Sequence, residues 1–246
     1  MLSATFLALA TLAAASPITP RQSGNAPFTW GKAYSLVVNV TDISTDFQSN
    51  PVHGLKVVGV HAGAGLNSPT VTFNPESHGD VFFNSLTDHT VRLSGGTPSL
   101  PPIGVKLYDN NPSAGNPPFL HELGFNFGNG TWGFGASAGP LNPRPCPQLW
   151  APLEGTFVVC DRGIEAPTYP RFAVQFVEGQ ANSGTHKWYQ PEPHVPANCV
   201  AVKLVPKCAT PSENDGKSSN GDVEAENVQC YPDVGAIQWA EYSECW

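Results

Sequence analysis

The chain has 246 residues, of which 20 are acidic and 12 basic, and its formal net charge is -8 at pH 7. The basic residues are scattered without forming a stripe. Nucleic acid and anionic membranes are therefore unsuitable partners, because binding phosphate groups requires clustered Lys and Arg. The 24 glycines and 25 prolines interrupt helices throughout the chain, which favours short strands separated by turns.

The first residues form an apolar run. Residues 2–15 are apolar or small, and a run of about 14 residues is shorter than the roughly 20 needed to span a bilayer. Its length and composition are typical of a secretory signal peptide. We expect residues 1–15 to be this signal, cleaved near residues 15–16, and residues 16–30 to be an N-terminal segment in which a short propeptide could end at Arg21. The alternative is a buried core helix, which Pro17 and Pro20 disfavour.

Nine later stretches have the composition of β-strands, and several alternate apolar with polar residues. This alternation is the period of a strand that is buried on one face. No helical pattern alternates with them, so the prediction is an all-β fold, an antiparallel β-sandwich or barrel-like domain over residues 31–208. The stretches are residues 34–40, 54–61, 70–73, 81–84, 90–94, 103–108, 156–160, 172–177 and 200–205.

The C-terminal part differs in composition. Residues 209–227 contain no aromatic residue and are predicted to be a flexible linker. Residues 228–246 follow as a short tail that contains two cysteines. The last residues are polar, without the hydrophobic tail of a lipid-anchor signal, so a soluble, extracellular protein is expected.

Six cysteines follow the signal, and an even number in an exported chain predicts three disulfides. Spacing alone does not choose among the pairings. Cys230 with Cys245, and Cys146 with Cys208, are candidate pairs. A zinc site is the alternative, but the chain has no Cys-x-x-Cys pair.

Two Asn-x-Thr triplets, beginning at Asn39 and Asn129, agree with export and are candidate sites of N-glycosylation.

Two sequence patterns resemble catalytic motifs without meeting their requirements. Residues 135–139 match Gly-x-Ser-x-Gly, but that motif needs a helix after the serine, and prolines follow here. His121 and Glu122 begin like His-Glu-x-x-His, but Phe125 stands where the second metal-binding histidine belongs. We therefore predict no catalytic residue, no metal site and no cofactor.

Sugar chemistry is the remaining enzymatic hypothesis. Paired carboxylates for glycoside hydrolysis would come from Asp80, Asp88, Asp161 and Glu178, whose separation the sequence does not determine. The aromatic side chains of Trp132, Trp150, Trp188 and Tyr189 could stack on sugars, although we expect most of the six tryptophans to lie in the core.

The segment His61-Ala-Gly-Ala-Gly-Leu-Asn67 lies between two predicted strands. Its glycines supply turn geometry, and Asn67 could tie the turn through its side-chain amide. A phosphate-binding loop is the alternative reading, but such a loop must open a helix, and Pro69 and a strand follow here. His61, Asn67 and Asp161 are the candidate ligand-binding residues.

Four short stretches of the chain resemble the motifs of a known family. They are residues 61–67, Cys160-Asp161, the Tyr-Pro-Arg-Phe of residues 169–172 and the Pro-Ala-Asn-Cys of residues 196–199. In these stretches the chain resembles a family of small secreted proteins of filamentous fungi that carry a domain of unknown function. The resemblance covers residues 34–206. It implies a β-rich secreted fold, a fungal source and a Cys160–Cys199 disulfide, and it implies no activity. Cys146 and the cysteine-bearing tail look like additions to the family pattern.

The function that these observations favour is that of a secreted, non-enzymatic fungal protein at the cell surface, in the wall or at a host interface. Its expected partner is a cell-wall glycan or a host-surface component. The alternatives are a secreted hydrolase acting on polysaccharide or ester bonds, and a carbohydrate-binding module.

Overall fold

The structure is a computed structural model that describes residues 27–94, 101–109, 117, 119–136, 146–163, 170–179, 194–210, 225–239 and 242. The predicted signal peptide, Ser137 of the Gly-x-Ser-x-Gly match, Trp188, Tyr189 and most of the predicted linker lie outside these residues. The described part contains twelve strands and the 3-10 turn η1 (Ile43–Thr45). The strands are β1 (Thr29–Gly31), β2 (Ala33–Val40), β3 (Lys56–Gly63), β4 (Leu66–Thr72), β5 (Val81–Asn84), β6 (Val91–Leu93), β7 (Ile103–Leu107), β8 (Leu120–Phe127), β9 (Gly155–Asp161), β10 (Phe172–Glu178), β11 (Cys199–Ala209) and β12 (Val228–Cys230).

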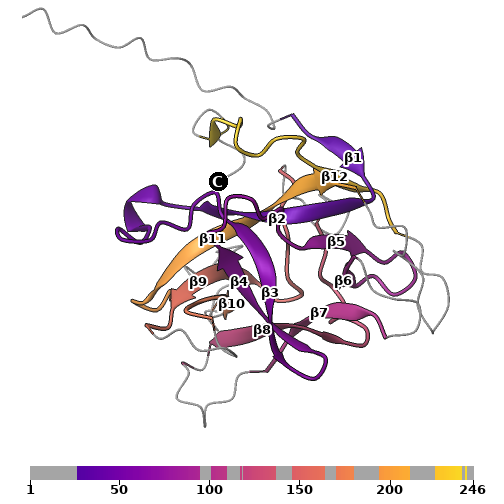
Figure 1. Cartoon of the computed structure of the whole chain (residues 1–246), viewed down its shortest axis with the longest axis horizontal. Helices are drawn as coiled ribbons and strands as arrows, with labels where there is room; N and C mark the ends of the chain where they lie inside the picture. Colours follow the sequence, from indigo (N-terminus) through magenta and orange to yellow (C-terminus); the bar gives the residue numbers. More distant parts are fainter. Residues whose placement is uncertain are drawn as a thin grey trace, which may run out of the picture.

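Ten of these strands form one sheet that closes on itself (Figure 1). β2 pairs with β11, β11 with β9, β9 with β10, and β10 with β8. From β8 the pairing continues through β7, β6 and β5, and β5 returns to β2. The β3–β4 hairpin links β2 to β8 and β10. The named strands pair antiparallel, so the prediction of an antiparallel, barrel-like all-β fold is confirmed.

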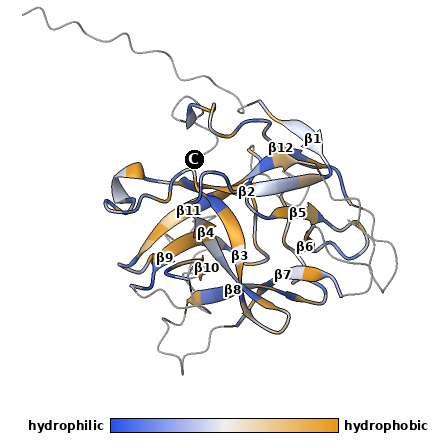
Figure 2. Ribbon diagram, in the orientation of Figure 1, coloured by the Kyte–Doolittle hydropathy of each residue, from blue (hydrophilic) through white to orange (hydrophobic). Residues whose placement is uncertain are grey.

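The core lies inside this closed sheet and follows the period of two. In β2 the side chains of Tyr34, Leu36, Val38 and Val40 face the main hydrophobic cluster, while Val37 faces a second cluster on the outer side. Apolar residues run through β9 and β11 as well, as the colours of Figure 2 show. These central strands are covered on both faces, which explains why they are apolar at nearly every position.

All nine predicted strands are present, β5 with the predicted ends and the others with shifted ends, but β1, β8 and β12 were not predicted. β8 reads LHELGFNF, in which apolar residues do not alternate regularly. His121 occupies a buried position because its Nε2 lies 3.0 Å from Glu178 Oε2 and its Nδ1 lies 3.2 Å from the Tyr108 carbonyl oxygen. A polar residue that is satisfied in this way interrupts the pattern without interrupting the strand.

The C-terminal tail is part of the fold and not an addition to it. β12 pairs with β1, at the edge of the barrel in Figure 1, and Val228 and Cys230 are fully buried in the main core cluster. Tyr231 donates its N–H to the Pro206 carbonyl oxygen and accepts a hydrogen bond from the N–H of Cys208, both at 2.9 Å. The tail therefore follows the end of β11 closely.

The path of the strands determines which cysteines are paired. The structure contains the Cys160–Cys199 disulfide that the family resemblance implies, between facing residues of β9 and β11. Cys208 is bonded to Cys230, so the candidate pairs Cys230–Cys245 and Cys146–Cys208 are wrong. The physical reason is that β12 returns to β11, which brings Cys230 beside Cys208. Cys146 is also disulfide-bonded.

Among the described residues, no helix is long and apolar enough to span a membrane.

Candidate functional site

Asn67, a predicted ligand-binding residue, is committed to joining two strands. Its backbone N–H donates to Asn126 Oδ1 at 3.1 Å, and its Nδ2 donates to the Phe125 carbonyl oxygen at 3.0 Å. The amide thus connects β4 with β8 instead of tying its own turn. His61 faces Asn67 across the β3–β4 hairpin and is exposed. The two residues are neighbours, but His61 is exposed whereas Asn67 is half-buried.

The turn of this hairpin needs its glycine. Gly65 has φ of +70°, a conformation that L-residues with a side chain rarely adopt, and a Cβ there would overlap the Phe127 ring. Glycine therefore serves both the turn and the close approach of an aromatic ring, and no phosphate is needed to explain it.

Asp161, the third predicted residue, lies at the far end of β9 and is not brought near His61 by any strand pairing. Its carboxylate accepts two hydrogen bonds from Arg171, from Nε at 2.9 Å and Nη2 at 2.8 Å, and one from the Gly163 N–H. The hydrogen bonds from Arg171 hold the pKa of Asp161 below its usual value. This pair joins the end of β9 to the start of β10, which is a structural role.

The other candidate carboxylates are separately engaged. Asp80 accepts a hydrogen bond from the Gly59 N–H at 2.6 Å, and burial raises the pKa of Asp80. Asp88 pairs with the buried Arg92. Burial alone would raise the pKa of Asp88, but hydrogen bonds from Ser85, Thr90 and Arg92 outweigh it and lower the pKa. Glu178 contacts His121. Each carboxylate therefore has its own partner.

No group of three or more His, Cys, Asp or Glu side chains in the described part of the chain is placed to hold a metal ion.

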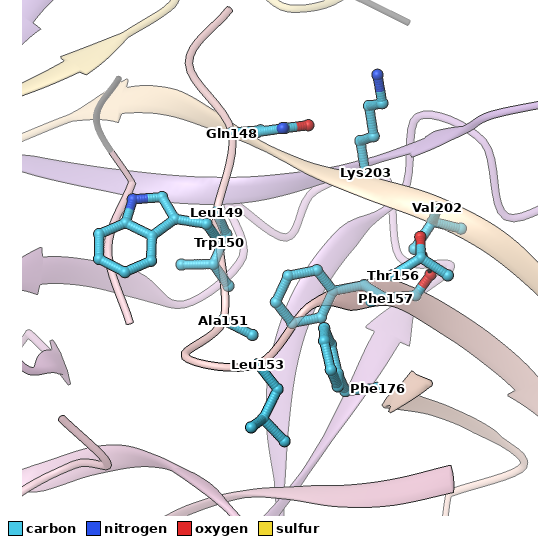
Figure 3. A pocket seen from close by; sticks show the side chains of 11 residues that line it. Gln148, Leu149, Trp150, Ala151, Leu153, Thr156, Phe157, Phe176, Val202 and Lys203 are labelled. Atoms are coloured by element: carbon cyan, nitrogen blue, oxygen red, sulfur yellow. Dashed lines mark hydrogen bonds between the residues drawn. The ribbon is translucent and has the colours of Figure 1, made fainter. Parts of the chain in front are cut away.

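One small cavity lies beside β9, β10 and β11 (Figure 3). Its volume is about 70 Å³, and the rings of Phe157 and Phe176 meet in it edge to face. Trp150, Gln148 and Lys203 also line it, and Figure 3 shows the Lys203 amine extending away from the two rings. Ligand pockets usually measure about 300 Å³ or more. The cavity therefore has room for a few water molecules and not for a sugar residue.

The tryptophans are not where the sequence predicts them. Of the four described, Trp30 and Trp132 are 61% and 67% exposed, and Trp150 and Trp239 are only partly buried. The core is built instead from Phe, Val, Leu and Tyr side chains. The expectation of buried tryptophans was wrong because β-branched and phenyl side chains fill the narrow interior of the closed sheet.

An exposed apolar surface lies on the outer face of the sheet, where the β3–β4 hairpin meets β7 and β8. We call it the β8 surface and define it by Leu66, Lys106, Tyr108 and Asn126. Leu66 faces Asn126 across β4 and β8, and Asn126 Nδ2 donates to the Tyr108 hydroxyl oxygen. Lys106 faces Gly124 across β7 and β8, and its Nζ donates to the Phe127 carbonyl oxygen at 3.0 Å.

A glycine supports the aromatic ring of this surface. A Cβ at Gly124 would lie 2.7 Å from Tyr108 Cε2. The Tyr108 ring therefore rests against the backbone of β8, while Leu66 and Tyr108 remain 48% and 38% exposed. Phe127 is also exposed, but it lies on the other face of β8, where its ring packs on Gly65. The β8 surface is a shallow, rigid array of apolar groups with a hydroxyl and an ammonium group beside them.

The two predicted glycosylation sites have different surroundings. Asn39 lies inside β2 and is 2% exposed, so a glycan on its side chain cannot be accommodated in this fold. Asn129 is exposed, and its Oδ1 accepts a hydrogen bond from Arg92 Nη2 at 3.2 Å. Of the two sequons, only the one at Asn129 is compatible with a glycan in the folded protein.

These features define a disulfide-bonded all-β protein with a closed, barrel-like sheet and a shallow apolar surface on its outside. The chain belongs to the family described as Domain of unknown function (DUF7907), which matches residues 31–208. The resemblance read from the sequence is therefore confirmed.

One curated relative matches along nearly its whole length. Antigenic protein SchS34 of Stachybotrys chartarum is 31% identical over 237 residues, which cover 93% of this chain and 99% of that protein. Because so much of both chains is covered, the likeness extends beyond the family match, which ends at residue 208. No solved structure matches the chain.

Proposed function

We propose that this chain is a secreted fungal protein that acts by binding, without catalysis, and that its β8 surface attaches it to neutral polysaccharide of the cell wall. The observation that carries the proposal is the exposure of the Leu66 and Tyr108 side chains on the outer face of the sheet, on either side of Asn126. The predicted signal peptide, the disulfides and the relative named as an antigenic protein support an extracellular location.

The chemistry of the surface suits sugars. Aromatic rings held flat on a surface can pack against the C–H faces of pyranose rings, and the adjoining polar groups can bond to sugar hydroxyls. The Tyr108 ring is the aromatic group of the β8 surface, and its hydroxyl and the Lys106 ammonium are the adjoining polar groups. A long polysaccharide chain can lie along a shallow surface, which needs no deep pocket.

The test is a depletion assay with insoluble chitin and β-glucan. Wild-type protein should be removed from solution by at least one polysaccharide, and Tyr108→Ala and Leu66→Ser should each weaken that binding about tenfold, the equivalent of roughly 1.4 kcal/mol. Trp30→Ala removes an aromatic side chain from β1 that is even more exposed than Tyr108 but lies outside the β8 surface, and it is the matched control.

Equal binding by the three variants would show that another surface is used. Release of soluble sugars from either polysaccharide at enzyme-like rates would contradict the non-enzymatic part of the proposal and favour a hydrolase.

A further inference from the structure

Asn129 is held in a fixed orientation by a buried arginine. Arg92 on β6 is 5% exposed, pairs with Asp88, and donates from Nη2 to Asn129 Oδ1 at 3.2 Å. The amide oxygen of Asn129 therefore faces the protein. Its Nδ2 makes no hydrogen bond to the part of the chain that the structure describes, which leaves this nitrogen for solvent or for a substituent.

The backbone after Asn129 is also fixed. Thr131 donates its N–H to the Val105 carbonyl oxygen at 2.8 Å, and its Oγ1 accepts a hydrogen bond from the Leu107 N–H at 3.0 Å. Gly130 lies so close to β7 that a Cβ would approach the Val105 carbonyl oxygen to 2.8 Å. The whole Asn-Gly-Thr triplet is thus packed along the outside of β7.

Trp132 follows directly and has the greatest exposure of the large hydrophobic side chains described, at 67%. At the next residue the chain bends, because Gly133 has φ of +94°, and Phe134 then enters the core. A tryptophan left open on a well-ordered segment has a large apolar area that something else could cover. It is three residues from an exposed Asn in an Asn-x-Thr triplet.

We infer that Asn129 carries an N-linked glycan in the exported protein, and that its innermost N-acetylglucosamine packs on the exposed face of Trp132. In the modification, Asn129 Nδ2 forms a bond to C1 of the sugar while the lipid pyrophosphate that carried the oligosaccharide leaves from C1, and the amide loses one proton. The inference rests on the export assumed in the proposed function, and it does not depend on polysaccharide binding.

The first part of the test is glycopeptide mapping of protein secreted by a eukaryotic host. A glycan should be found at Asn129 and none at Asn39, which is buried in β2.

The second part measures the coupling between glycan and tryptophan. Wild-type, Trp132→Ala and Trp30→Ala proteins are made with the glycan, and again without it in a bacterial host that forms disulfides. The glycan should raise the Tm of wild type by about 2–4 °C, the shift typical for a small stabilisation in a chain of this size. It should do so equally in Trp30→Ala and by less than half as much in Trp132→Ala. Trimming the glycan to its first sugar should preserve the effect.

The outcomes separate this inference from the proposed function. An exported protein with Asn129 unmodified, or a glycan effect equally large in Trp132→Ala, would overturn the inference alone. A chain retained inside the cell with both triplets unmodified would contradict export itself, and with it the proposed function as well.

Discussion

At the scale of single residues, the polar side chains that look functional in the sequence mostly join neighbouring strands. Asn67 connects β4 to β8, and Asp161 holds Arg171 at the end of the β9–β10 pair. The strand that sequence reasoning expected after residues 61–67 is present as β4. The sequence did not reveal the partners of these side chains. Phe125 comes next to Asn67, and Arg171 next to Asp161, only through strand pairing.

The Asp161–Arg171 pair leads to a pH-dependent prediction. Because the pKa of Asp161 is lowered in the folded protein, the pair stabilises the fold above the unfolded pKa of the carboxyl, and this contribution is lost as the pH falls through the folded pKa. Asp161→Asn should cost about 1 kcal/mol at pH 7, a value expected for a partly exposed bidentate pair.

Urea denaturation of both proteins between pH 7 and pH 2.5 measures this cost. The difference between wild type and Asp161→Asn should shrink towards the acid end of the range. A difference that stays constant with pH would mean that the carboxylate charge is not what stabilises the pair.

At the scale of elements, the strands with regular alternation were predictable and the irregular ones were not. β11 and β7 show the period of two, whereas β8 begins with the adjacent buried residues Leu120 and His121, which interrupt that period. The β8 surface could not be predicted from the sequence either, because its residues are far apart in the chain. Leu66, Tyr108 and Asn126 belong to separate segments, and only the pairing of β4, β7 and β8 brings them to one face.

β12 was also missed, because three residues after a polar stretch carry no periodic signal, yet Val228 lies fully buried in the main core. Val228→Ala should therefore lower the free energy of unfolding by about 2 kcal/mol, from the lost burial of two methyl-sized groups and the cavity left behind. Ile43→Ala, at an exposed position of η1, is the control and should change it by less than about 0.5 kcal/mol. A negligible effect of Val228→Ala in chemical denaturation would mean that the tail is not part of the cooperative fold.

At the scale of the whole molecule, the first and last described strands, β1 and β12, pair with each other in a separate two-stranded sheet, and the Cys208–Cys230 disulfide ties β12 to β11. The sequence predicted three disulfides from the even number of cysteines, and the family resemblance implied Cys160–Cys199. It could not predict Cys208–Cys230, because the position of β12 beside β11 depends on contacts distant in sequence.

Peptide mapping without reduction tests this connectivity. Cys160 should be linked to Cys199 and Cys208 to Cys230. Since Cys146 is also bonded and one cysteine of the sequence remains, we predict that Cys146 is linked to Cys245. Recovery of a peptide that joins Cys230 to Cys245 would contradict the path of the tail.

The central claim is that the β8 surface binds polysaccharide, and hydrogen–deuterium exchange with a soluble chitin or β-glucan oligosaccharide tests it most directly. The account predicts slower exchange in the presence of the sugar at residues 63–67, 104–108 and 122–128, where the β3–β4 turn, β7 and β8 form the surface. Protection confined to other segments, such as those around the small cavity at Phe157 and Phe176, would contradict it.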